Sequence, residues 1–420
     1  HRQPGKPRRH LIDPILEEDA MGVMDGVKVL EVAEHGFVPS AAAILAEWGA
    51  DVVKVERPTG DPLRLIMSMG FAADTGDFNW LFEQFNRNKR GVALDLRDAD
   101  GRAALDRLIA WADVYITSFL PSARAKLRLD PEDIWAVNPR CVYAIGSGQG
   151  LEGPDADLGG FDAVSYWARG GLAHMLTQKG APLVQPRGAL GDAPSGAFLA
   201  GGIAAALFHR ERTGERTLVD VSLLGAAVWT LSNDLLPTTI LQDEPKRHVA
   251  GKSLGSVLVG SYRTADERWL SLNMLDPERH WAPTCRALGL DELTERPEYA
   301  TAAQRAERSP ELHPIFVDRI GSLTLAELKE RLGAQDTIFS PIASPVEVVN
   351  DPQVIANGYL ARHPDHPNAR LASSPMQFDG HGLEVRRGAP MVGEHSDDVL
   401  REVGMGDEEI ARLREKGTLV

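Results

Sequence analysis

The first organised stretch of the chain alternates between short apolar runs and a helical pattern. Apolar runs at 27–33 and 51–56 flank a loop and a helix expected from about Pro39 to Trp48, within "GVKVLEVAEHGFVPSAAAILAEWGADVVKVERP". Strand, helix and strand in this order form a βαβ unit, whose two strands run parallel because the helix carries the chain back. This unit constrains the architecture strongly, because parallel sheets need helices on both faces.

The same alternation continues to about residue 146. Strands are expected in "RGVALDL", "DVYITSF" and "RCVYAIGSG", and helices in "GRAALDRLIAWA" and "DPEDIWAVN". One more strand and helix follow in "TLVDVSLLGAAVWTLSNDLL". The predicted fold class is therefore α/β, with a doubly wound, mostly parallel, Rossmann-like sheet.

The pattern changes after about residue 237. Two antiparallel strands around a polar turn are predicted in "VLVGSYRTADERWLSLN", and helical patterns run on through "AELKERLGA". At 420 residues the chain also exceeds what one hydrophobic core usually organises. We therefore expect a disordered extension at 1–23, a large α/β domain at 24–237, a small α+β domain at 240–335, and a segment at 336–420 that returns to the large domain.

The charge balance restricts the class of partner. A net charge of −15 is the opposite of the basic excess that nucleic acid or an anionic membrane attracts, although local basic pockets remain open. The apolar runs are shorter than the roughly 20 residues of a membrane span, and the polar start contains no signal-peptide pattern. Two cysteines, Cys141 and Cys285, fit a reducing compartment. We expect a cytoplasmic protein that binds neither nucleic acid nor membrane.

Three weaker motifs each lack part of the pattern that their chemistry needs. Glu56 ends the second strand, where the acid of a dinucleotide site binds ribose, yet the first turn "AEHGFVPS" does not contain G-x-G-x-x-G. The hydrolase pattern G-x-S-x-G occurs around Ser253 at 251–255, but no buried strand precedes it, so a flexible loop is expected. The histidines, including those in "HPDHP", lack metal-ligand spacing, so no metal site is expected.

One carboxylate stands at the start of a helix rich in small residues. In "RGALGDAPSGAFLAGGIAAALFHRERTG", Asp192 is followed by Ala193 and Pro194, which places it at or near a helix N-cap. Backbone N–H groups and the helix dipole are expected to keep its carboxylate ionised, as a nucleophile requires. Most aspartates at such positions only cap the helix, but Gly191 and the small residues leave room for a substrate. The pattern alone leaves capping and catalysis open.

Several blocks of the sequence together resemble one enzyme family. They are "VLEVAEHGFVPSAAAILAEWGADVVKVERPTGDPLR", "NRNKRGVALDL", "ADVYITSFLPSARAKLRL", "ALGDAPSGAFLAGGIAAALFHRERTGE" and "GEHSDDVLREVGMGDEEIARL". In order and spacing, from about Met24 to the C-terminus, they are similar to the class III CoA-transferases, which include formyl-CoA transferase, carnitine CoA-transferase and α-methylacyl-CoA racemase. The resemblance implies that Asp192 is the catalytic aspartate, because the family's aspartate lies in the "GD" before this helix.

The resemblance also implies an activity and a set of contacts. CoA would pass from an acyl-CoA thioester to a free carboxylic acid through mixed anhydrides and an aspartyl-CoA thioester. Coenzyme A and acyl-CoA would be substrates, with no tightly bound cofactor, and an interlocked homodimer would place the active site between both chains. The family's CoA-contacting positions fall on Glu34, His35, Phe37, Arg57, Leu94, Arg97, Phe119, Ala123 and Lys126. Arg57, Arg97 and Lys126 suit the phosphates of CoA.

Departures from the family pattern bear on the reaction. The racemase branch has "GHD" where this chain has "GFD", so Phe161 replaces an acid–base histidine, and a phenyl ring carries no proton. Gly36 replaces a glutamine of formyl-CoA transferase, Ser118 replaces an amide, and the loop at 251–255 lacks a run of glycines. We therefore expect transfer, with a substrate pair other than formyl-CoA and oxalate. Racemase or epimerase activity is the alternative; a non-catalytic CoA-binding protein and a nicotinamide-dependent dehydrogenase are more remote ones.

Overall fold

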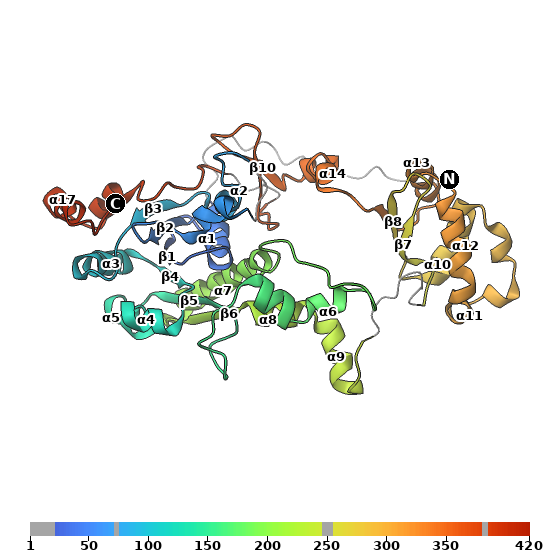
Figure 1. Ribbon diagram of the computed structural model, residues 1–420, viewed down its shortest axis with the longest axis horizontal. Helices are drawn as coiled ribbons and strands as arrows, with labels where there is room; N and C mark the ends of the chain where they lie inside the picture. Colours follow the sequence, from blue (N-terminus) through green and yellow to red (C-terminus); the bar gives the residue numbers. More distant parts are fainter. Residues whose placement is uncertain (1–21, 71–74, 246–254, 380–384) are drawn as a thin grey trace, which may run out of the picture. The chain divides into compact units, whose positions relative to one another are not determined.

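The computed structural model describes residues 22–70, 75–245, 255–379 and 385–420. These residues belong to two compact units (Figure 1). Unit one comprises residues 1–170, 187–229 and 358–420, and unit two comprises residues 171–186 and 230–357. The extension up to residue 21 and Ser253 with most of its loop lie outside the described residues.

Unit one is built on a six-stranded parallel sheet with the strand order β3-β2-β1-β4-β5-β6. The strands are β1 (Lys28–Val32), β2 (Asp51–Glu56), β3 (Arg90–Ala93), β4 (Val114–Thr117), β5 (Val142–Ser147) and β6 (Leu218–Ser222). This order is that of a doubly wound sheet, in which the direction of winding reverses beside β1. The predicted mostly parallel, Rossmann-like α/β fold is confirmed.

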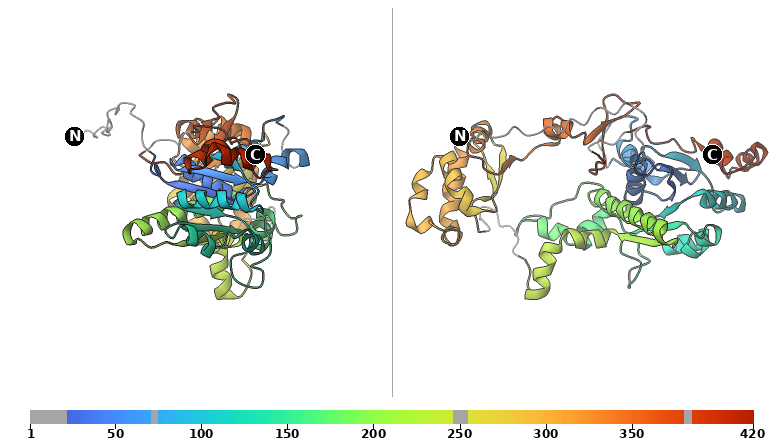
Figure 2. Two further views of the ribbon diagram at one scale, coloured as in Figure 1. Left: turned by 90° about the vertical axis from the view of Figure 1, so that its left-hand side faces the viewer. Right: turned by 180° about the vertical axis from the view of Figure 1, so that it is seen from behind.

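Helices cover both faces of this sheet, as Figure 2 shows from two further sides. One face packs against α3 (Ala99–Trp111), α5 (Pro131–Val137), α16 (Ser396–Glu402) and α17 (Asp407–Glu415), through a core that contains Leu30, Tyr115 and Leu413. The other face carries α1 (Phe37–Glu47) and α7 (Asp192–Thr213), which pack on each other. Side chains alternate between the faces of a strand, which is why β1 contributes to both layers.

Small residues allow α1 and α7 to approach closely. A Cβ atom built on Gly196 of α7 would overlap with the Ser40 hydroxyl of α1 and lie 3.0 Å from the amide nitrogen of Ala41. The Ser40 hydroxyl also donates a 3.3 Å hydrogen bond to the backbone carbonyl of Asp192. This packing fixes the start of α7 against the start of α1.

Helix α1 begins two residues earlier than the sequence pattern indicates. Its first residue is Phe37, and Pro39 lies inside its first turn. A proline is tolerated there, because the first N–H groups of a helix have no partner within the helix. The remaining elements of unit one are η1 (Pro62–Met69), α2 (Trp80–Asn86), α4 (Pro121–Leu127), η2 (Asp162–Arg169), α8 (Leu223–Thr230), β10 (Leu360–Arg362) and β11 (Arg370–Ala372).

Unit two contains a three-stranded antiparallel sheet of β7 (Val259–Arg263), β8 (Trp269–Asn273) and β9 (Phe339–Pro341). A separate core contains Trp281, Phe316 and Leu328, which come from three helices of this unit, together with residues of the sheet. Its helices are α6 (Leu172–Leu176), α9 (Ser232–Leu241), α10 (Pro277–Leu288), η3 (Asp291–Thr294), η4 (Pro297–Tyr299), α11 (Ala302–Glu307), α12 (Ser309–Gly321), α13 (Leu325–Gly333), α14 (Pro345–Val349) and α15 (Pro352–Ala356). In the described part of the chain, no helix combines the length and apolarity needed to cross a bilayer.

Candidate functional site

A cavity of about 900 Å³ lies in unit one at the carboxyl ends of the parallel strands. Its walls are the segments that follow β1, β2, β3, β4 and β5, together with the start of α7. In open α/β sheets, ligands bind outside the carboxyl ends of the strands, beside the point where the winding reverses. The cavity therefore occupies the position that this fold provides for a ligand.

All of the site residues predicted from the sequence line this one cavity. They are Asp192 and the nine expected CoA contacts Glu34, His35, Phe37, Arg57, Leu94, Arg97, Phe119, Ala123 and Lys126. Gly36, Ser118 and Phe161, at which the sequence departs from the family that it resembles, line it as well. Residues that follow five strands and one residue at the start of a helix therefore line a single cavity, and their roles in binding remain predictions.

Asp192 is the first residue of α7, and Gly191 rather than Asp192 is the N-cap. Burial, and secondarily the negative charge of Asp162, raises the pKa of the Asp192 carboxyl to about 7. Asp162 is held nearby, since its Oδ2 accepts a 3.3 Å hydrogen bond from the N–H of Gly191. Burial and the Asp162 charge thus act against the ionisation that the helix N-terminus was expected to favour.

The loop after β1 closes directly against Asp192. A Cβ atom built on Gly36 would overlap with Oδ2 of Asp192, so only glycine fits there with the carboxylate in this position. The ring of His35 packs edge-on against the ring of Phe161, with centroids 5.0 Å apart. The Asp192 carboxyl thus has the Gly36 backbone on one side, and His35 and Phe161 form an aromatic pair in the same cavity.

The basic residues of the cavity differ in how far they are paired. Arg57 donates to the carbonyl of Gly60 at 3.0 Å and lies 3.4 Å from the carboxylate of Glu34, whose pKa burial raises. Arg97 forms an exposed ion pair of 2.7 Å with Asp95. Lys126 is exposed and has no ion pair or hydrogen bond to the described residues. Two of these three cations, Arg57 and Arg97, therefore already have an acidic partner on the cavity wall.

Two of the competing sites are not available in the structure. The carboxylate of Glu56 accepts 2.8 Å and 2.7 Å hydrogen bonds from Nε of Arg64 and the N–H of Asp61, so it has no free face for a ribose. Among the residues that the structure describes, no cluster of histidine, cysteine and carboxylate side chains could hold a metal ion. The dinucleotide reading thus loses the residue on which it depended.

A set of buried charged residues beside the loop between β1 and α1 was not predicted from the sequence. Glu31, Lys54, Asp61 and Lys89 are all buried, and the first two lie inside strands. Charged residues in a strand that is covered on both faces must find a partner, and that is the signal that was available. Asp162 was also missed, because nothing in its local sequence indicates that it lies near Asp192.

The comparisons with known proteins agree with this geometry. Residues 24–396 match the profile of CoA-transferase family III. The chain is 28% identical to (R)-2-hydroxy-4-methylpentanoate CoA-transferase of Clostridioides difficile, covering 94% of this chain and 98% of that protein. It is 31% identical to the beta subunit of succinyl-CoA–L-malate CoA-transferase of Chloroflexus aurantiacus, covering 93% and 96%.

A solved structure is similar over the same extent. The crystal structure of a CAIB/BAIF family protein from Brucella suis superimposes with a TM-score of 0.80 and 26% sequence identity, and covers 91% of this chain and 100% of that one. The family profile, the relatives and the solved structure therefore all span both units. On these grounds the chain belongs to the class III CoA-transferases.

Proposed function

We propose that this protein transfers CoA from an acyl-CoA thioester to a free carboxylic acid, with Asp192 as the nucleophile. The observation that carries the proposal is the position of Asp192 on the wall of the cavity that also contains every expected CoA contact. A carboxyl with a pKa of about 7 is ionised in a large fraction of molecules at neutral pH, and its raised basicity favours attack on a carbonyl.

The first half of the reaction loads CoA onto the enzyme. The Asp192 carboxylate attacks the donor's thioester carbonyl, the C–S bond breaks, and CoA thiolate leaves behind a mixed anhydride. The thiolate then attacks the aspartyl carbonyl of the anhydride, which releases the donor as its free carboxylate. The product is an aspartyl-CoA thioester that keeps the activated bond on the enzyme.

The second half reverses these steps with the acceptor. The acceptor's carboxylate attacks the aspartyl thioester, CoA thiolate leaves, and a second mixed anhydride forms. The thiolate attacks the acceptor's carbonyl, which yields the new acyl-CoA and regenerates the Asp192 carboxylate. Both anhydrides react readily with water, so the partly buried setting of Asp192 favours transfer over hydrolysis.

The rest of the cavity is suited to the parts of CoA. Arg57, Arg97 and Lys126 would bind its phosphates, because guanidinium and ammonium groups pair with them. Phe37, Leu94 and Phe119 supply apolar surface for the less polar parts of the molecule. Coenzyme A enters and leaves as a substrate in this scheme, with no further cofactor.

Transfer is favoured over racemisation by the side chains around Asp192. Racemisation requires two acid–base groups on opposite sides of an α-carbon. Phe161 occupies the family's histidine position on the cavity wall, and its ring carries no proton. His35 supplies an imidazole to the same cavity, so deuterium uptake at the α-carbon of a 2-methylacyl-CoA would support the racemase alternative.

The test measures CoA transfer in the wild type and in Asp192→Ala. The donor probes are succinyl-CoA and 2-hydroxy-4-methylpentanoyl-CoA, and the acceptors are L-malate and 2-hydroxy-4-methylpentanoate. We expect the wild type to form a new acyl-CoA, and Asp192→Ala to lose turnover while its affinity for CoA stays the same. Equal turnover in both proteins would contradict the role of Asp192.

A further inference from the structure

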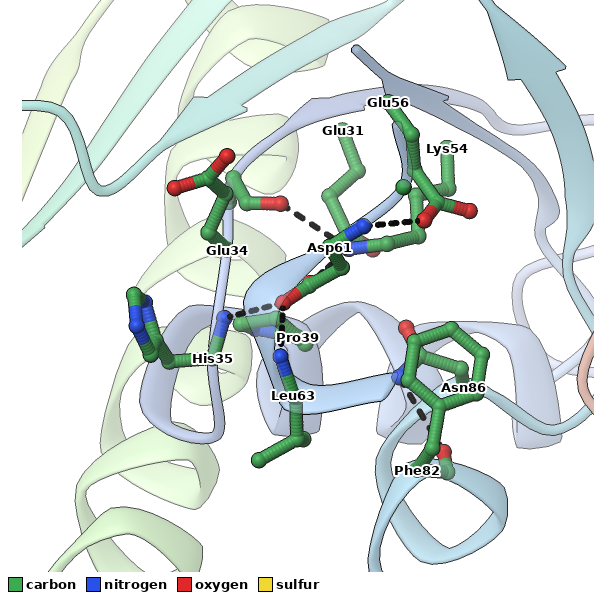
Figure 3. Close-up of polar contacts among 12 residues, drawn as sticks. Glu31, Glu34, His35, Pro39, Lys54, Glu56, Asp61, Leu63, Phe82 and Asn86 are labelled. Carbon is green, nitrogen blue, oxygen red and sulfur yellow. Dashed lines mark hydrogen bonds and ion pairs between the residues drawn. The ribbon is translucent and has the colours of Figure 1, made fainter. Parts of the chain in front are cut away.

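Four ionisable side chains, those of Glu31, Lys54, Asp61 and Lys89, form a buried network beside the loop that follows β1. Figure 3 labels three of them, Glu31, Lys54 and Asp61. Nζ of Lys54 lies 2.8 Å from Oε1 of Glu31 and 3.0 Å from Oδ2 of Asp61. Nζ of Lys89 lies 2.5 Å from Oε2 of the same Glu31. Removing each of these charged groups from water is costly, so a gain in stability is a poor reason for the network to exist.

The network forms hydrogen bonds with the backbone of the loop between β1 and α1 and with the first turn of α1. Lys54 donates to the carbonyl of Ala33 at 2.9 Å, and Lys89 donates to the carbonyl of Pro39 at 2.9 Å. Between these two points, Oδ1 of Asp61 accepts a 3.1 Å hydrogen bond from the N–H of His35. The loop is therefore fixed before, within and after the segment that faces the cavity.

Of these three backbone positions, His35 is the one whose conformation is unfavourable without a fixed partner. His35 has φ +73°, a left-handed conformation that is unfavourable for a residue with a side chain. Such a conformation persists only when the surroundings determine it. Asp61 is itself fixed, because its N–H donates to Glu56 at 2.7 Å and its Oδ1 also accepts from Leu63 at 2.9 Å.

The conformation of His35 decides where Gly36 lies. Gly36 is the next residue, and its backbone approaches the Asp192 carboxyl so closely that a Cβ atom would fit only if this carboxyl moved. A shift of the loop would therefore change the space in which a thioester carbonyl reaches Asp192. A misplacement of about 1 Å can slow a reaction by roughly 100-fold.

We propose that Asp61 is a positioning residue for the reaction at Asp192. It acts through the N–H of His35: it holds this residue left-handed and so keeps the Gly36 backbone against the reactive carboxyl. The inference rests on the proposed transferase function. It does not require Asp61 to touch a substrate.

The experiment compares Asp61→Asn and Asp61→Ala with the wild type, using succinyl-CoA and L-malate or whichever pair of the panel reacts fastest. Asp61→Ala removes both the hydrogen bond to His35 and the ion pair with Lys54, and we expect kcat to fall by about 100-fold. Asp61→Asn keeps an acceptor oxygen, and we expect a loss of roughly tenfold. In both variants the KM for acyl-CoA should change much less than kcat.

Glu47→Gln is the matched control for the loss of a buried ion pair. Glu47 pairs with Arg87 at 2.5 Å in the same unit, and neither residue lines the cavity. We expect its thermal midpoint to fall while kcat stays within about twofold of the wild type. If its kcat fell as far as that of Asp61→Asn, the effect would be general destabilisation and the inference would be overturned.

A double-mutant cycle with His35→Gly tests the route of action. Glycine adopts the left-handed conformation without cost, so replacing Asp61 should slow the enzyme less when residue 35 is already glycine. The inference would be overturned if the losses in kcat from the Asp61 and His35 substitutions were additive, or if the Asp61→Asn protein were as fast as the wild type. If Asp61→Ala does not fold, the cycle is made with Asp61→Asn, and these two results still test the inference. A wild type that transfers no CoA would instead refute the proposed function.

Discussion

At Asp192, burial and a neighbouring negative charge act on the same carboxyl. Both raise its pKa, to about 7, and burial is the larger cause. Only the ionised form attacks a carbonyl, so the rate of acylation should rise with pH and level off above about 7. Pre-steady-state release of CoA, measured from pH 5.5 to 8.5, gives this profile.

Asp162→Asn separates the two causes. It removes the negative charge that disfavours ionisation but leaves the burial, so the inflection of the pH–rate profile should move to lower pH. The variant can still accept the hydrogen bond from Gly191 through its amide oxygen. An inflection that stays in place or moves to higher pH would contradict this account of Asp192.

Gly36→Ala tests the close approach to the carboxyl. The added methyl group would overlap with Oδ2 of Asp192 and force this side chain away, so we expect kcat to fall by up to about 100-fold while CoA still binds. Gly188→Ala is the matched control, because its Cβ atom meets nothing within 4 Å and the residue does not line the cavity. Equal kcat values for the two variants would argue against a packed contact at Gly36.

The same residues show what local sequence can predict. The type and approximate place of Asp192, at the start of a small-residue helix, follow from the pattern around it. Its pKa does not, because desolvation depends on segments that are distant in the sequence. The left-handed backbone of His35 is equally hidden, since it is maintained by Asp61, 26 residues further on.

Among the elements, the contact between α1 and α7 positions the start of α7. Gly196→Ala would place a methyl group on the Ser40 hydroxyl, and we expect it to lower the free energy of unfolding by about 1–3 kcal/mol. Gly201→Ala, in the same helix, meets nothing within 4 Å and should raise it by roughly 0.5–1 kcal/mol. Urea denaturation measures the free energy of unfolding of both variants. A Gly196→Ala protein as stable as the wild type would refute the close packing of α1 and α7.

Helices and strands with a regular repeat of apolar residues could be predicted well from the sequence. The ends of the helices and of the domains could be predicted less well. The strand at Asp51–Glu56 lies where the apolar run indicates, and β7 and β8 form the expected antiparallel pair. Helix α1 starts earlier than Pro39, because a first-turn proline does not stop a helix. The small domain was expected at 240–335, whereas unit two of the structure comprises 171–186 and 230–357.

For the whole molecule, we propose that two copies of the chain form a homodimer. Large apolar side chains are exposed on α7 and α8 of unit one, among them Phe198, Phe208 and Trp229, which are 43%, 63% and 68% exposed. Exposed apolar side chains on this scale suit a protein–protein interface. Light scattering of the wild type should give twice the mass of the chain. The double variant Phe208→Arg, Trp229→Arg should give a mass closer to that of a single chain. A monomeric wild type would contradict the proposal.

The central claim is that an oxygen of Asp192 becomes acylated during turnover. The most direct measurement is peptide mass spectrometry of the wild type and Asp192→Asn after incubation with succinyl-CoA and trapping with hydroxylamine or borohydride. Hydroxylamine should leave a hydroxamate, and borohydride an alcohol, on the wild-type peptide that contains Asp192, with neither on the variant. A wild type that transfers CoA while this peptide stays unmodified, or an adduct on another residue, would contradict the account.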